Sequence, residues 1–137
     1  AIHHALDINY PIGIITKDYL DDKEDIILND IEKYVTSIGR KFHYFNCDFS
    51  ERENTHRFVD QLRENGLDPN ILVSNAGSLI RTELKKHSDD HWDRILEINL
   101  SSQFILAREL SQKMVEKGWG KIIFTASILY SCKVIFS

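Results

Sequence analysis

A short, fully apolar run that ends in a polar turn constrains this chain most. Residues 71–73 read Ile-Leu-Val, and Ser74, Asn75, Ala76 and Gly77 follow directly. An uninterrupted aliphatic run of this kind is typical of a parallel strand that is covered on both faces. A glycine at its end permits a positive φ or the close approach of backbone to a ligand, and ligands bind beyond the carboxyl ends of such strands. Asn75 and Gly77 also fit an ordinary turn, so both interpretations stay open here.

Helices and strands alternate before this run. Apolar residues recur at helical spacing over residues 27–38, and Gly39 stops them. Ser50 followed by Glu53 matches a capping box, so a second helix is predicted from there to residues 65–66. The other expectations are strands at residues 12–16 and 41–46, a helix tail at residues 1–9, and inward side chains Phe58, Val59 and Leu62.

A long helix is predicted after the loop of residues 77–88. Loops of this length in compact domains are more often functional than idle. Ser88, followed by two aspartates, suits the helix start, and Gly118 suits its end. Asn99 lies on the inward stripe of this helix, where a side-chain amide must find hydrogen-bond partners. The other members of that stripe are Trp92, Ile95, Leu96, Gln103, Leu106, Leu110 and Met114.

A final apolar run repeats the pattern of the first. Residues 121–127 form an expected strand that ends in a small hydroxyl side chain, Ser127. Strands and helices alternate along the chain, which predicts an α/β fold with a parallel sheet and right-handed crossovers. With 137 residues and no Pro/Gly-rich linker, a single domain over residues 1–137 is expected.

Charge and composition disfavour several classes of partner. The net charge is −4 and the basic residues are scattered, so no face suits nucleic acid. No apolar run reaches the roughly 18 residues that a membrane span needs. Cys47 and Cys132 form no disulfide framework and there is no leader peptide, so the cytoplasm is the expected location. His87 and His91 are interpreted as solvated polar residues, and no metal site is predicted.

Three motifs in order identify a family. Asn-Ala-Gly follows a strand, Glu-Ile-Asn-Leu lies in the next helix, and Thr-Ala-Ser follows the next strand. Their order and spacing resemble the short-chain dehydrogenase/reductase family, and Asp48 after the preceding strand also matches. The resemblance covers nearly the whole chain. It implies a three-layer, Rossmann-like fold with a doubly wound parallel sheet.

The resemblance implies a nicotinamide cofactor, NAD or NADP. Asp48 would contact its adenine, while Asn75, Ala76 and Gly77 would line the cofactor and steady the central sheet. Asp18, an acid near the end of the second strand, would bind the ribose hydroxyls and favours NAD. An alternative for Asp48 is that it only caps a loop.

The resemblance also implies two catalytic residues. Asn99 would hold a water in the proton relay of the family, although a buried structural amide is an alternative. Ser127 would hydrogen-bond the hydroxyl or carbonyl group of a small alcohol or ketone substrate. Such a bond orients the group and stabilises charge that develops when hydride is exchanged.

Parts of the family pattern are missing from this sequence. The first strand and its Gly-x-x-x-Gly-x-Gly turn are absent, and the family strand order 3-2-1-4-5 implies a hole in mid-sheet with unpaired backbone groups. The acid/base Tyr and its Lys partner would lie beyond Ser137, because Tyr130 and Lys133 follow Ser127 too closely and stand three apart. The tail of residues 128–137 also departs from the family pattern. We therefore expect an incomplete short-chain dehydrogenase.

Shorter similarities to the family suggest a class of substrate and an oligomeric state. Trp92, the turn of residues 118–121 and the Thr-Ala-Ser-Ile-Leu segment look similar to the sugar-acid and polyol branch, such as gluconate or deoxygluconate dehydrogenases. Helices similar to residues 89–117 form dimer and tetramer contacts in the family, so a homo-oligomer is expected. The alternative is a non-catalytic remnant that acts through association with another chain, because its sheet edges are unpaired.

Overall fold

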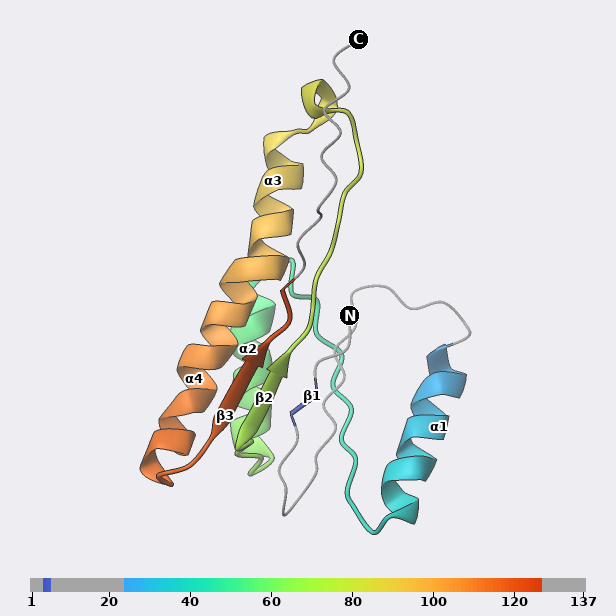
Figure 1. Ribbon diagram of the computed structural model, residues 1–137, viewed down its shortest axis with the longest axis vertical. Coiled ribbons are helices and arrows are strands. Elements are labelled where there is room, and N and C mark those ends of the chain that lie inside the picture. Colours follow the sequence, from blue (N-terminus) through green and yellow to red (C-terminus); the bar gives the residue numbers. More distant parts are fainter. Residues whose placement is uncertain (1–3, 6–23, 127–137) are drawn as a thin grey trace.

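The computed structural model describes residues 4–5 and 24–126, in which helices pack on a small sheet (Figure 1). The elements are β1 (His4–Ala5), α1 (Glu24–Ser37), α2 (Arg52–Glu64), β2 (Ile71–Ser74), the 3₁₀ turn η1 (Leu84–Lys86), α3 (Asp89–Leu96), the π-helical turn η2 (Glu97–Ser101), α4 (Ser102–Glu116) and β3 (Lys121–Phe124). Within these described ranges, every helix is too short or too polar to cross a membrane.

The strands β2 and β3 are parallel, as the alternation of elements predicts. Ile71 lies opposite Lys121 and Ser74 lies opposite Phe124. The Thr125 N–H then donates to the Ser74 carbonyl at 2.9 Å, so the pairing extends one residue beyond β3. The segment α3–η2–α4, called the long helix below, connects the two strands. Because the strands are parallel, their carboxyl ends lie at the same end of the sheet. The prediction of an α/β fold with a parallel sheet is confirmed.

The other edge of β2 carries β1, which runs antiparallel to it. His4 pairs with Val73 and Ala5 with Leu72, and β3 lies on the opposite side of β2. The predicted helix tail is therefore wrong at these two residues, because the open backbone groups of β2 favour a strand partner. In the family strand order this edge belongs to the first strand, so β1 covers part of the expected hole. Residues 12–16, the other early strand predicted, lie outside the described residues.

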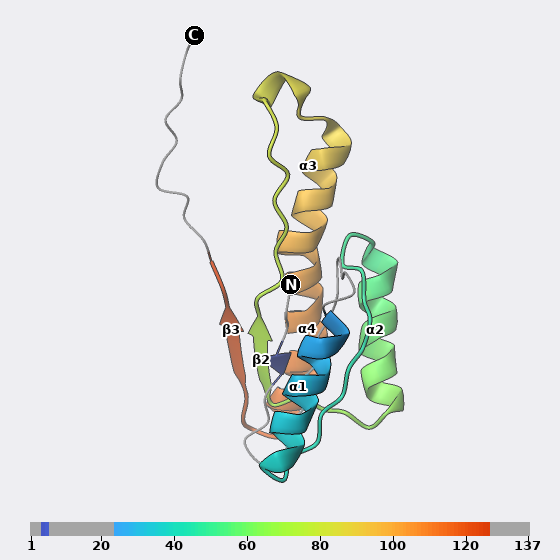
Figure 2. The same ribbon diagram turned by 90° about the vertical axis from the view of Figure 1, so that its right-hand side faces the viewer.

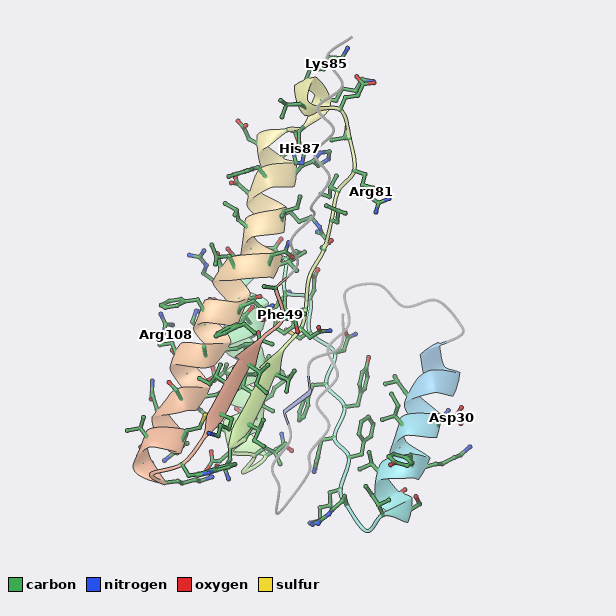
Figure 3. All side chains as sticks on the ribbon, in the orientation of Figure 1. Asp30, Phe49, Arg81, Lys85, His87 and Arg108 are labelled. Atoms are coloured by element: carbon green, nitrogen blue, oxygen red, sulfur yellow. The ribbon has the colours of Figure 1, made fainter. Side chains whose placement is uncertain are left out.

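Both α2 and α4 cover the same face of the sheet. Figure 2 shows the sheet nearly edge-on, with α4 and then α2 on one side of it. Phe58, Val59 and Leu62 of α2 are buried, as predicted. Figure 3 places Phe49 among the packed elements, whereas Asp30 and Arg108 point outward. The buried cluster comprises Cys47, Phe49, Phe58, Val59, Leu62, Leu67, Leu72, Ile98, Leu106, Leu110 and Met114.

Residues 41–46 form no strand, which corrects the expectation from their aromatic content. Side chains nevertheless alternate here: Cys47 and Phe49 are buried, while Asn46 and Asp48 are exposed. Phe49 meets Phe58 edge-to-face with ring centroids 6.2 Å apart. A strand needs a neighbour for its backbone groups, and within the described residues this segment pairs with none. The alternation of buried and exposed side chains therefore reflects packing on α2 and not hydrogen bonding to a neighbouring strand.

The capping-box prediction at Ser50 and Glu53 is also wrong. The helix begins at Arg52 after Glu51, and no side chain caps its first turn. The Ser50 N–H instead donates to Asp48 Oδ1 at 2.8 Å, which forms a local turn before the helix. The predicted end of α2 is confirmed, because Gly66 adopts a positive φ of 67° there.

Two predicted apolar faces are less buried than expected. In the long helix, Gln103 and the apolar residues that follow it on the stripe are buried, but Trp92 is 61% exposed. Tyr34 of α1 and Ile38, which follows the last helical residue Ser37, are 68% and 55% exposed, and Gly39 with a φ of 75° follows the helix end as predicted. Figure 1 places α1 apart from α2 and α4, in keeping with the exposure of this part of its apolar face.

Candidate functional site

A π-helical turn interrupts the long helix at its centre. The helix α3 ends at Leu96, η2 spans Glu97–Ser101, and α4 continues from Ser102. In an α-helix the Ser102 N–H would bond to the Ile98 carbonyl, but here it donates to the Glu97 carbonyl five residues earlier. Single π turns inside α-helices are frequent at functional sites. Asn99, the amide that stood out in the sequence, lies in the middle of this turn.

The side chain of Asn99 contacts the loop that follows the Asn-Ala-Gly turn. Asn99 Oδ1 accepts a hydrogen bond from the Ser78 N–H at 2.7 Å, and Asn99 Nδ2 donates to the Ser78 carbonyl at 3.0 Å. Asn99 is exposed, so of the buried structural amide alternative the burial is wrong, whereas the hydrogen bonds to Ser78 match a structural role. The π turn thus fixes the backbone just beyond β2.

A second amide side chain, Gln103, reaches the same segment from within the core. Its Nε2 donates to the Ala76 carbonyl at 3.3 Å and to the Ile98 carbonyl at 3.1 Å. Sequence reasoning assigned Gln103 only to the apolar stripe and missed this role. The available signal was a second amide four residues after Asn99 on the same stripe. Asn99 and Gln103 together are called the amide clamp below.

The clamp leaves the turn beyond β2 open on its other side. Ser74 is buried, Ala76 is half-buried, and Asn75 and Gly77 are exposed. Gly77 has no positive φ, so it is not a conformational requirement of the turn. A Cβ on Gly77 would lie 3.6 Å from Asn99 Oδ1, which is an ordinary contact. Residues 75–78, called the strip below, are therefore partly exposed and are held by the clamp at the Ala76 carbonyl and at both backbone groups of Ser78.

Asp48 shapes the loop before α2. Its Oδ1 accepts the Ser50 N–H, and its side chain is exposed. This hydrogen bond matches the loop-capping alternative. Asp48 therefore has a structural part here, and its contact with a cofactor stays a prediction.

Two predicted site residues, Ser127 and Asp18, lie outside the described residues, as do Tyr130 and Lys133. The chain leading to Ser127 is described as far as residue 126. Because Thr125 bonds to the end of β2, the motif of residues 125–127 begins beside the Asn-Ala-Gly turn. Two of the three family motifs and the start of the third thus belong to one region of the molecule.

The histidines of the loop and α3 form an aromatic pair. The rings of His87 and His91 meet edge-to-face with centroids 5.4 Å apart. Ser88 caps α3, as predicted, by accepting the His91 N–H at 3.2 Å. Residues 4–5 and 24–126 contain no group of three or more His, Cys, Asp or Glu residues that could hold a metal ion.

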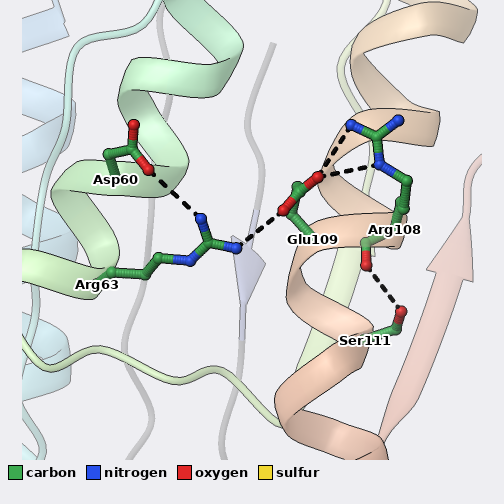
Figure 4. Close-up of polar contacts among 5 residues, drawn as sticks. All are labelled: Asp60, Arg63, Arg108, Glu109 and Ser111. Atoms are coloured by element: carbon green, nitrogen blue, oxygen red, sulfur yellow. Dashed lines mark hydrogen bonds and ion pairs between the residues drawn. The ribbon is translucent and has the colours of Figure 1, made fainter.

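Ion pairs fix α2 against the long helix on both sides of the clamp. Arg52 contacts Glu97 through two hydrogen bonds of 3.1 and 2.7 Å, which raise the pKa of Arg52. Further along, Arg63 donates to Glu109 at 2.8 Å, as Figure 4 shows. Hydrogen bonds from Arg63 and then from Arg108 lower the pKa of Glu109. These pairs connect α2 to the long helix, which carries the clamp.

Comparisons with known proteins agree with these motifs. The family model described as short chain dehydrogenase matches residues 19–135. A 2-dehydro-3-deoxy-D-gluconate 5-dehydrogenase of Pseudoalteromonas atlantica is 44% identical over 101 residues, covering 74% of this chain and 40% of that protein. The enzyme with the same name from Bacillus subtilis is 35% identical over 102 residues, with the same coverage.

Solved structures give the same picture for the fold. A metagenomic short-chain oxidoreductase in complex with NADP superimposes with a TM-score of 0.71 at 24% identity. The match covers 88% of this chain and 52% of that structure. The Rossmann-like prediction is therefore confirmed. The chain spans about 40% of the length of the curated relatives named above.

Proposed function

The chain belongs to the short-chain dehydrogenase family, and on that premise we propose that it is a partial dinucleotide-binding domain, residues 1–137, of an NAD(P)-dependent oxidoreductase. The reaction is hydride transfer between nicotinamide and a hydroxyl or carbonyl group of a small substrate. The family match does not favour the alternative of a non-catalytic remnant.

The observation that carries this proposal is the pairing of Asn99 with Ser78. A π turn, an amide and an exposed backbone strip come together beyond the carboxyl end of β2. Ligands of open parallel sheets bind at such edges. A strip that is already fixed loses little conformational entropy when it contacts a ligand, which supports binding there.

Some of the predicted site residues would contact the cofactor, and others would act on the substrate or on proton transfer. Asp48 would contact the adenine, and residues 75–77 of the strip would line the nicotinamide cofactor. Asn99 would help to hold a water for proton transfer. Ser127 would donate a hydrogen bond to the substrate oxygen and stabilise the charge that develops on it. The bound cofactor supplies the hydride acceptor or donor, and the protein supplies orientation.

The cofactor would be NAD or NADP, with NAD favoured through Asp18. An acidic side chain at the end of the second strand binds ribose hydroxyls and repels the 2′-phosphate of NADP. The substrate would be a sugar acid, because two relatives at 44% and 35% identity carry the name 2-dehydro-3-deoxy-D-gluconate 5-dehydrogenase. The turn of residues 118–121, which looks similar to that of the sugar-acid branch, also supports this proposal.

We also propose that the protein forms homo-oligomers through the outer face of the long helix. Leu100 and Phe104 are 62% and 59% exposed and line a groove with Arg52, His56 and Arg108. Large apolar side chains that stay exposed beside one another mark interaction sites. A self-complementary contact between two copies of this face would bury them.

The cytoplasm is the proposed location. The sequence has only two cysteines, Cys47 and Cys132, too few for a disulfide framework, which supports this proposal.

Cofactor binding tests the proposal directly. NADH and NADPH are titrated in parallel into the purified chain, and energy transfer from Trp92 and Trp119 to the reduced nicotinamide is followed. Both indoles are accessible, at 61% and 43% exposure. Saturable transfer is expected, with tighter binding of NADH. Tighter binding of NADPH would reverse the role given to Asp18, and no transfer from either cofactor would contradict the proposal.

A further inference from the structure

Gln103 is unusual among the core residues of α4. Its side chain is 6% exposed and lies on the same stripe as Leu106, Leu110 and Met114. An amide in such surroundings loses its water and must be satisfied by the protein. The partners of Gln103 therefore indicate why a polar residue occupies this position.

The Gln103 amide nitrogen joins two backbone carbonyls that lack a regular helical or strand partner. One is the Ile98 carbonyl, whose usual donor, the Ser102 N–H, bonds elsewhere in the π turn. Ser102 Oγ also donates to the Ile98 carbonyl, at 2.8 Å. The other is the Ala76 carbonyl in the exposed strip. A single side chain thus ties the irregular helical turn to the irregular backbone beyond β2.

The other half of the Gln103 amide is unsatisfied. Within the part of the chain that the structure describes, Gln103 Oε1 is buried without a hydrogen-bond partner. An unsatisfied buried acceptor is unfavourable, and an apolar side chain of similar shape would avoid it. A contribution to the stability of the whole fold therefore does not explain why position 103 carries a glutamine and not an apolar residue.

We propose that Gln103 is a positioning residue that fixes Ala76 while Asn99 fixes Ser78. The two amides of the clamp come from positions four apart in the helix and grip backbone groups two residues apart in the loop. Together they set the path of the strip that faces the cofactor. This inference rests on the proposed function for its consequence on cofactor binding, whereas the effect on the strip stands on the contacts alone.

The test replaces the amide by an unbranched apolar side chain, Gln103→Met, in the full chain. Gln112→Met is the matched control, because Gln112 is exposed on the same helix. Three quantities are measured: hydrogen exchange of the Ser78 amide, the melting temperature, and the Kd for NADH from tryptophan energy transfer. Amides of β2, such as Leu72, report on general unfolding.

In Gln103→Met, exchange at Ser78 is expected to speed up by about three- to tenfold, as suits the loss of one hydrogen bond to the strip. The Kd for NADH is expected to rise by a similar factor, while the melting temperature and Leu72 exchange stay unchanged. Gln112→Met is expected to change none of these quantities.

Unchanged exchange at Ser78 in Gln103→Met would overturn the inference. So would a lower melting temperature with uniformly faster exchange, or failure of the variant to fold, because each would make Gln103 a packing residue only. If the unmutated chain binds neither NADH nor NADPH, the proposed function fails. The exchange measurement still decides the role of Gln103 in that case.

Discussion

Asn99 holds the backbone of Ser78 at both its N–H and its carbonyl group, across 21 positions of sequence. Such two-point pairing by one amide fixes both the distance and the orientation of the loop relative to the helix. The π turn supplies the geometry, because it carries Asn99 in a widened turn of the helix. The loop of residues 77–88 is therefore anchored at its start.

Removal of this pairing is expected to destabilise the chain. In Asn99→Leu, both Ser78 groups lose their partner, and the free energy of unfolding should fall by about 1 kcal/mol, since each exposed hydrogen bond contributes little. Urea denaturation measures the change, and Gln112→Leu on the same helix should alter it by less than about 0.5 kcal/mol. Equal stability of Asn99→Leu and the unmutated chain, with unchanged exchange at Ser78, would contradict this account.

Two glycines provide a matched test of the strip. A Cβ on Gly120 would lie 2.5 Å from Met114 Cβ, so Gly120→Ala should lower the free energy of unfolding by about 1–3 kcal/mol through overpacking. A Cβ on Gly77 makes only an ordinary contact, so Gly77→Ala should keep the fold within about 0.5 kcal/mol.

The same two variants separate stability from binding. We expect Gly77→Ala to leave NADH affinity unchanged, because the added methyl group would lie on the Asn99 side of the strip, 3.6 Å from Asn99 Oδ1, and away from the side proposed to face the cofactor. Denaturation and the NADH titration together check both statements. A clear loss of NADH affinity in Gly77→Ala, with unchanged stability, would mean that the cofactor approaches this backbone from the Asn99 side.

The Arg63–Glu109 pair predicts a pH dependence of stability. The pKa of Glu109 is lowered in the folded chain, so the unfolded chain binds a proton more readily at this site. The stabilisation is thus complete above the ordinary carboxyl pKa of about 4.3 and is lost as the pH falls through the lower folded value. At neutral pH it should amount to about 0.5 kcal/mol, since Arg63 is half exposed.

Glu109→Gln measures this contribution. The difference in unfolding free energy between the unmutated chain and Glu109→Gln should be present at neutral pH and disappear in acid. Glu64→Gln, an exposed position at the end of α2, serves as the control with no such difference. A difference that persists at low pH would assign the effect of Glu109 to packing instead of charge.

The proposed oligomer depends on the exposed apolar side chains of the long helix. Phe104→Lys places a charge in the contact and should raise the dissociation constant of the oligomer by at least about tenfold. Leu84→Lys is the control, because Leu84 is 91% exposed and lies in η1. Light scattering across a concentration series distinguishes the two. An unmutated chain that stays monomeric at all concentrations would contradict the proposed contact.

Elements whose signal is local were predictable from the sequence. The aliphatic runs of β2 and β3 predicted strands, and Ser88 predicted the start of α3, because these signals need no distant partner. The predicted strand at residues 41–46 failed for the opposite reason. Its aromatic residues suit a strand, but a strand forms only where another one lies beside it.

The clamp could be predicted only in part. Asn99 stood out as an amide on an apolar stripe, which is visible in the sequence. The π turn was not predictable, because its irregular backbone is stabilised by tertiary contacts of Gln103 and by Ser102 with Ile98. The prediction that Ser50 caps α2 failed because Asp48 Oδ1 accepts the Ser50 N–H in a local turn and the helix begins two residues later, at Arg52. Side-chain contacts with the backbone, local at Ser50 and Ser102 and long-range between Gln103 and Ala76, thus decided the points that these sequence patterns missed.

The most direct test of the central claim is to map cofactor binding onto the chain by NMR. Backbone amide shifts are recorded as NADH is added to the isotopically labelled protein. The account predicts that shifts concentrate at residues 75–78 and 48–50, while α1 and Leu84 are unaffected. Shifts that leave residues 75–78 unchanged, or no shifts at saturating NADH, would show that the strip held by Asn99 and Gln103 is not a cofactor site.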